Sequence, residues 1–87
     1  MSVPLGVAVM IQKIKGILAQ HGRLAVPLDE LLEDSDLYHA GLTSLATVGL
    51  MLALEDEFDI EFPDSMLSRK TFGSIESIVD AIEALQD

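Results

Sequence analysis

Ser44 is the residue whose type and position best suit chemistry in this chain. It follows Thr43, a good N-cap, and opens a predicted helix, so its hydroxyl would lie beside unpaired amides at the positive end of the helix dipole. Such donors stabilise a bound or covalently attached phosphate. On spacing alone, however, the better-supported interpretation is that Ser44 only helps to cap the helix, because capping serines are common.

Two other kinds of site can be weighed against the residue pattern. A serine nucleophile needs a base, and only His21 and His39 could act as one. Nothing in the sequence orients either imidazole, and no oxyanion hole is evident. Residues 34–36 begin like an EF-hand calcium loop, but His39 and Leu45 stand where that loop needs glycine and glutamate. We therefore expect neither an enzyme nor a metal site.

The composition is that of a small, acidic, folded domain. The 87 residues include 15 Asp and Glu against five Lys and Arg, which gives a formal net charge of −10, and 49% are hydrophobic. The negative field argues against nucleic acid or a membrane surface as partner. No cysteine is present, which excludes disulfides and thiolate sites. We expect a single domain over residues 1–87, a monomer, and a cytoplasmic location.

Apolar periodicity predicts three long helices. Apolar residues recur at helical spacing over 7–21, over 44–59 and over 75–85. Ser44 stands in the first turn of the second of these helices, and Ser74 is placed to cap the third.

The connections between these helices are less regular. A long irregular segment covers 23–43. Residues 59–62 alternate like a strand but have no second strand to pair with. Asp64 could then cap one short helical turn through Leu67. We expect an all-α fold, a small bundle of three long helices plus one short helix.

The middle helix is apolar on two sides. Leu45, Gly49 and Leu52 line the side opposite the expected core face, with Asp56 at the end of that side. Full burial needs a larger protein, so the second side indicates a partner. The alternative is that Leu45 packs under the long loop and Leu52 is an ordinary exposed leucine. The expected core face is made by Thr47, Leu50, Met51, Leu54 and Phe58.

The sequence around Ser44 resembles the acyl carrier protein family. The resemblance rests on residues 41–45, Gly-Leu-Thr-Ser-Leu, on Val48, and on residues 53–64, Ala-Leu-Glu-Asp-Glu-Phe-Asp-Ile-Glu-Phe-Pro-Asp. It covers about 35–85, and the first helix fits in length and place. It implies an acyl-carrier-protein-like bundle in which a phosphopantetheinyl transferase uses coenzyme A to attach 4′-phosphopantetheine to Ser44. The thiol of that arm would hold an activated cargo as a thioester.

Two departures from the family pattern affect partner choice. Thr43 stands where the family usually has Asp, and Ala46 and Gly49 stand where many members carry acids. A partner that docks near Ser44 would therefore meet a neutral surface, and acids return only at 55–57. This argues against service in ordinary fatty acid synthesis. The expected partner-binding residues are Thr43, Leu45, Ala46, Gly49, Leu52 and Asp56.

Among carriers with altered motifs, the sequence is most similar to the free-standing aminoacyl carrier proteins. That resemblance implies loading with an amino acid by an amino acid:[carrier protein] ligase that resembles seryl-tRNA synthetase, and a downstream acceptor enzyme. The alternative is a specialised acyl carrier protein of fatty acid or polyketide biosynthesis. Peptidyl carrier domains are a third option, although they usually belong to very long chains.

Overall fold

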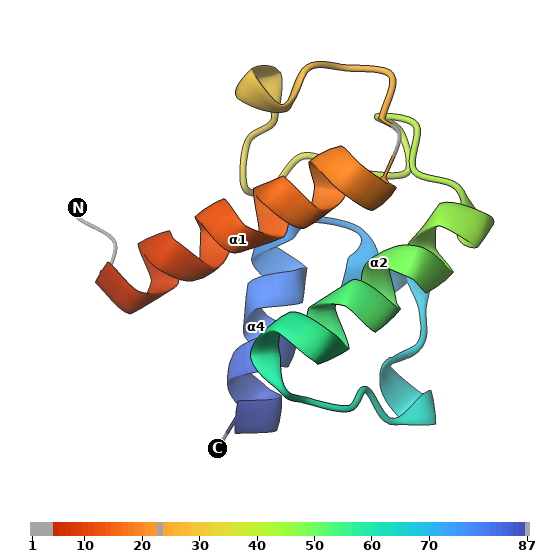
Figure 1. Cartoon of the computed structure of the whole chain (residues 1–87). Coiled ribbons are helices and arrows are strands. Elements are labelled where there is room, and N and C mark those ends of the chain that lie inside the picture. Colours follow the sequence, from red (N-terminus) through yellow and green to blue (C-terminus); the bar gives the residue numbers. More distant parts are fainter. Residues whose placement is uncertain (1–4, 23, 87) are drawn as a thin grey trace.

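The computed structural model describes residues 5–22 and 24–86, and Figure 1 shows their arrangement. These residues form helices and turns without a strand, so the predicted all-α class is confirmed. Two single turns of 3-10 helix, Leu28–Glu30 and Asp64–Met66, interrupt the connections. The α-helices are α1 (Leu5–His21), α2 (Ser44–Phe58), the short α3 (Arg69–Phe72) and α4 (Ile75–Gln86).

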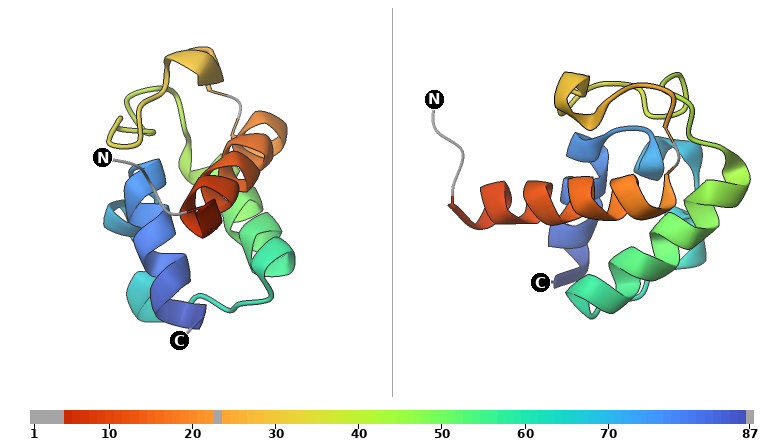
Figure 2. Two further views of the ribbon diagram at one scale, coloured as in Figure 1. Left: turned by 90° about the vertical axis from the view of Figure 1, so that its left-hand side faces the viewer. Right: turned by 45° about the horizontal axis from the view of Figure 1, so that its top comes forward.

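The three long helices enclose one apolar core. α1 contacts both α2 and α4, and the views in Figure 2 show it crossing these two helices. The predicted core face of α2 is buried at Leu50 and Leu54, whereas Thr47, Met51 and Phe58 are half-buried. The largest fully buried side chains come from all three long helices, α3 and the long loop: Ile14, Leu18, Leu37, Leu50, Leu54, Phe72, Ile75, Ile78 and Ile82.

Local hydrogen bonds explain where α4 begins and α2 ends. Ser74 caps α4 as predicted, because its Oγ accepts the Ser77 amide proton at 3.1 Å. The Ser77 Oγ accepts the Ser74 amide in return, also at 3.1 Å. α2 ends at Phe58 because the next residue, Asp59, adopts the left-handed conformation with φ 53°, and the Ile60 amide donates to the Glu55 carbonyl.

The short turn predicted from Asp64 through Leu67 forms as the 3-10 turn Asp64–Met66, and the Leu67 amide donates to the Asp64 carbonyl. The predicted Asp64 cap is wrong, because the cap position belongs to Pro63 and no side-chain hydrogen bond caps the turn. A further short α-helix, α3, is four residues long and absent from the sequence prediction. It is held by Phe72, whose ring is buried and meets the Phe62 ring edge-on at a centroid distance of 5.2 Å. A tertiary contact, and not a local cap, therefore sets this element.

The irregular segment before α2 is tied to the bundle. The Leu37 amide donates to the Gly73 carbonyl at 2.7 Å, and the Leu37 and Leu42 side chains are buried. Gly41 has φ +118°, and a Cβ there would lie 2.8 Å from the Ala25 backbone nitrogen. Only glycine fits this turn without strain. These contacts therefore fix the position of the start of α2 on the surface.

Candidate functional site

Ser44 occupies the first turn of α2, and Thr43 is the cap. The Thr43 Oγ1 accepts the Ala46 amide proton at 3.0 Å, which confirms the predicted capping role of Thr43. The Thr43 carbonyl accepts the Thr47 amide at 2.9 Å. Because Thr43 performs the capping, the helix does not need the Ser44 hydroxyl for that purpose. Ser44 itself is exposed.

The surroundings of Ser44 fit a covalently attached phosphate. α2 is 15 residues long and has no acid in its first turn. An α-helix leaves its first amides outside the internal hydrogen-bond ladder, and its N-terminus carries partial positive charge. A phosphodiester on the Ser44 oxygen would therefore meet unpaired donors and no nearby carboxylate from this turn. The residues present match what a phosphate-linked group requires.

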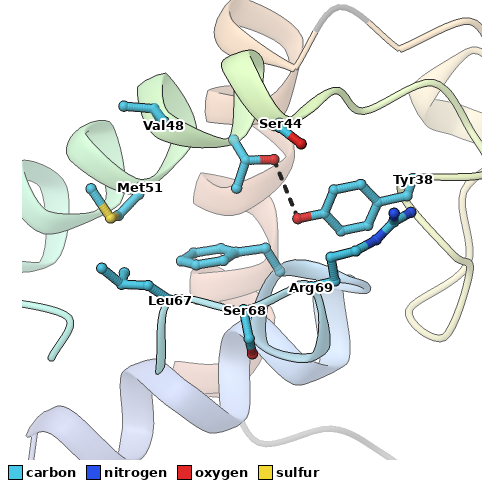
Figure 3. A pocket seen from close by; sticks show the side chains of 9 residues that line it. Tyr38, Ser44, Val48, Met51, Leu67, Ser68 and Arg69 are labelled. Carbon is cyan, nitrogen blue, oxygen red and sulfur yellow. Dashed lines mark hydrogen bonds between the residues drawn. The ribbon is translucent and has the colours of Figure 1, made fainter. Parts of the chain in front are cut away.

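A hollow of about 290 Å³ opens beside Ser44, between α2 and the chain that leads into α3 (Figure 3). At its edge the Arg69 guanidinium lies over the Tyr38 ring, 4.3 Å from the ring centroid. The Thr47 hydroxyl donates to the Tyr38 hydroxyl at 3.3 Å, the contact dashed in Figure 3. The lining combines an apolar floor with a cation at the rim: Tyr38, Ser44, Thr47, Val48, Met51, Leu67, Ser68, Arg69 and Phe72.

Sequence reasoning missed Tyr38 and Arg69 as neighbours of Ser44. The two residues reach the hollow from a loop and from α3, and neither segment has a periodic pattern. One signal was available, since Arg69 is one of only five basic residues in an acidic chain.

The second apolar side of α2 faces solvent. Leu45 is 84% exposed and Leu52 is 56% exposed, so the alternative in which Leu45 packs under the loop is wrong. Val48, 51% exposed, belongs to the same surface and was not predicted there. Ala46 and Gly49 are half-buried.

The remaining predicted partner residues lie at the two ends of this side of α2. Asp56 is exposed near the end of α2. At the beginning of the helix, a second hollow brings the predicted residues Thr43, Leu45, Ala46 and Gly49 together with Gln20 and His21, the last two residues of α1.

The histidines do not join Ser44. His39 lines a separate hollow with Glu30 and Asp36, and His21 approaches α2 beside Gly49. Within residues 5–22 and 24–86, no three His, Asp or Glu side chains are grouped as a metal site would require. In the same part of the chain, no helix is long and apolar enough to cross a membrane.

Comparison with known proteins gives a family match over most of the chain. The family described as "Phosphopantetheine attachment site" matches residues 12–82. The chain is 50% identical over 74 residues to the aminoacyl carrier protein of Agrobacterium fabrum, which covers 85% of this chain and 89% of that protein. It is 39% identical over 57 residues to the D-alanyl carrier protein of Streptococcus uberis, covering 64% of this chain and 72% of that protein.

Solved structures show the same similarity. One is an engineered Bradyrhizobium japonicum glycine:[carrier protein] ligase complexed with a carrier protein from Agrobacterium tumefaciens and ATP. The matched chain of that structure superposes on this chain with a TM-score of 0.82 and is 49% identical, over 86% of this chain and 97% of the matched chain. Another is the Bradyrhizobium ligase complexed with glycylated carrier protein. Its matched chain superposes on this chain with a TM-score of 0.66 and is 34% identical, over 87% of this chain and 97% of the matched chain.

Proposed function

The chain belongs to the carrier proteins with a phosphopantetheine attachment site, and on that premise we propose that Ser44 is the residue that bears the 4′-phosphopantetheine. Proteins of this family are carriers of covalently attached cargo and not enzymes. The observation that supports Ser44 most directly is its exposure in the first turn of α2, beside a cap made by Thr43. There the helix amides and dipole would stabilise the phosphodiester. When attached, the arm supplies a thiol that holds cargo as a thioester.

We propose an amino acid as the cargo and an amino acid:[carrier protein] ligase as the loading partner. The relative from Agrobacterium fabrum is an aminoacyl carrier protein, and related carriers were crystallised with glycine:[carrier protein] ligase. The neutral surface at Leu45, Ala46 and Gly49 supports a partner that docks through shape and apolar contact. A phosphopantetheinyl transferase would install the arm, and a downstream acceptor enzyme would take the aminoacyl group.

We propose that residues 1–87 act as one carrier domain in the cytoplasm. The family match runs over 12–82, which includes all of α2 and the larger part of α1 and of α4. Coenzyme A, which donates the arm, and ATP, which drives formation of the aminoacyl adenylate, are both cytoplasmic metabolites. A tethered cargo reaches each partner at high effective concentration, which is the physical benefit of the arm.

The attachment residue can be tested by intact mass. The protein is incubated with coenzyme A and a broad-specificity phosphopantetheinyl transferase, beside Ser44→Ala and Ser68→Ala variants. Ser68 is the matched control, because it is an exposed serine that lines the same hollow. We expect one phosphopantetheine adduct on the wild type and on Ser68→Ala, and none on Ser44→Ala. An adduct that persists in Ser44→Ala would overturn the proposal.

The cargo needs a separate assay. Holo protein is offered amino acids and ATP with the engineered Bradyrhizobium japonicum ligase, and the thioester is followed by intact mass. We expect an aminoacyl adduct that hydroxylamine removes. If fatty acid enzymes load and extend the holo protein as efficiently as their usual carrier, and the ligase does not load it, the specialised acyl carrier interpretation replaces this one.

A further inference from the structure

We propose that a notch between the end of α1 and the first turns of α2 receives an uncharged, apolar side chain of the amino acid:[carrier protein] ligase. The inference rests on the proposed carrier function and names the contact through which the ligase is recognised. The notch has a volume of about 450 Å³. It is lined by Gln20, His21, Thr43, Leu45, Ala46 and Gly49.

Packing does not explain the glycine in this notch. A Cβ added at Gly49 would meet the His21 Nδ1 at 3.7 Å, which is an ordinary contact distance. Glycine inside a helix is less stable than alanine, because it loses more backbone freedom on folding. The fold would thus accept the Cβ of alanine at residue 49, and the helix would gain stability from it. Because glycine has no side chain, the notch instead stays open between His21 and the exposed Leu45.

The position of the notch suits a partner that acts on the arm. Thr43 and Leu45 line it, and they are the two neighbours of Ser44 in the chain. Leu45 is 84% exposed, so it projects beside the notch and can enter a pocket of the partner while the partner fills the notch. A well-packed, desolvated contact of this kind is where binding energy concentrates. A ligase seated here would lie next to the root of the arm.

The charge around the notch indicates whether a second copy of this chain or a different protein occupies it. None of the residues that line the notch is acidic, although the whole chain has a net charge of −10. A second copy of the chain would bring another −10 and be repelled at long range. Asp56, the exposed acid on the same side of α2, lies about 10 Å further along the helix than Gly49, at 1.5 Å per residue. The complementary surface therefore has an apolar side chain at the notch and a basic residue about two helical turns away, which suits a different protein better than a second acidic copy.

The test places a leucine side chain in the notch at residue 49 and makes the same substitution at a glycine outside the notch. Gly16 is the matched control, because it also lies within a helix and a Cβ there meets nothing within 4 Å. Binding of holo protein to the engineered Bradyrhizobium japonicum ligase is measured by calorimetry, and glycylation by intact mass. We expect Gly49→Leu to raise the Kd and lower the loading rate by about tenfold or more, as for loss of a central contact. Gly16→Leu should bind and load like the wild type.

Thermal unfolding controls for folding, since leucine favours a helix more than glycine and neither variant should melt below the wild type. If Gly49→Leu does not fold, His21→Trp fills the same notch from α1 and should weaken binding instead. Equal binding by Gly49→Leu and the wild type would overturn the inference, as would equal weakening by Gly49→Leu and Gly16→Leu. A wild type that carries the arm on Ser44 but does not bind the ligase would overturn this inference and leave the carrier function intact.

Discussion

Thr43 caps α2 with a neutral hydroxyl, so the helix starts without an acid beside Ser44. Thr43→Ala removes the Oγ1 that accepts the Ala46 amide at 3.0 Å, while the Thr43 carbonyl keeps its bond to Thr47. Loss of an N-cap costs about 1 kcal/mol. We expect Tm to fall by about 4–8 °C, the usual shift per kcal/mol for a domain of this size. Thr43→Ser keeps the hydroxyl and should have a Tm near that of the wild type. If Thr43→Ala also melts near the wild type, the hydroxyl is not a stabilising cap.

Glu55 has a structural role that its place in an acidic run conceals. Its Oε2 accepts the Phe62 amide proton at 2.8 Å in partly buried surroundings, which fixes the chain that leaves α2. A hydrogen bond to a charged group contributes about 1.5–3 kcal/mol. Glu55→Ala should therefore lower the free energy of unfolding in urea by about that amount. The exposed Glu61 is the control, and Glu61→Ala should change stability little. Equal effects at both positions would contradict this role.

At the scale of elements, α3 depends on the core more than on its own sequence. It has four residues, and its buried side chain is Phe72, 2% exposed. Phe72→Ala should destabilise the protein by about 3–5 kcal/mol, because it leaves a cavity and loses the edge-on contact with Phe62. Leu67→Ala, at a position 45% exposed, is the matched truncation and should cost far less. Calorimetric unfolding of the two variants measures the difference; similar losses would show that Phe72 does not anchor α3.

Periodicity explains why the three long helices were predictable and α3 was not. Ile14, Leu18 and Ile82 are fully buried, as the helical spacing of apolar residues indicated. Four residues are too few to show a helical period, and α3 forms because Phe72 is drawn into the core. Asp64 has the residue type of a cap, yet the turn it opens is a 3-10 turn without one. Local sequence therefore predicted the elements that bury a face of their own.

The same distinction holds for the site. Thr43, Ser44 and Leu45 are consecutive, so the cap, the candidate attachment residue and the exposed apolar neighbour could be predicted together. The Tyr38–Arg69 stack beside Ser44 joins a loop to α3. The notch likewise joins the end of α1 to α2. Neither follows from local sequence, because both depend on how distant segments pack.

At the scale of the whole molecule, the negative charge is largely uncompensated. Within residues 5–22 and 24–86 one ion pair forms, between Lys13 and Glu57 at 3.6 Å, and both side chains are substantially exposed. Exposed pairs of this kind contribute about 0–1 kcal/mol. Arg69 stacks on Tyr38, a contact with an aromatic ring. The acids thus act mainly as a long-range field that attracts a basic partner, whereas the first turn of α2, which carries Ser44, contains no acid.

That field should oppose folding, because like charges crowd a small bundle. Adding salt screens them, with a Debye length near 10 Å at 0.1 M, so Tm should rise as NaCl increases and should rise further with Mg²⁺. The triple variant Glu30→Gln, Glu33→Gln and Asp34→Asn removes three exposed charges from the loop over the bundle. It should melt above the wild type in dilute buffer and respond less to salt, because less repulsion remains to be screened. Scanning calorimetry across a salt series measures both slopes, and a Tm indifferent to ionic strength in both proteins would refute the repulsion.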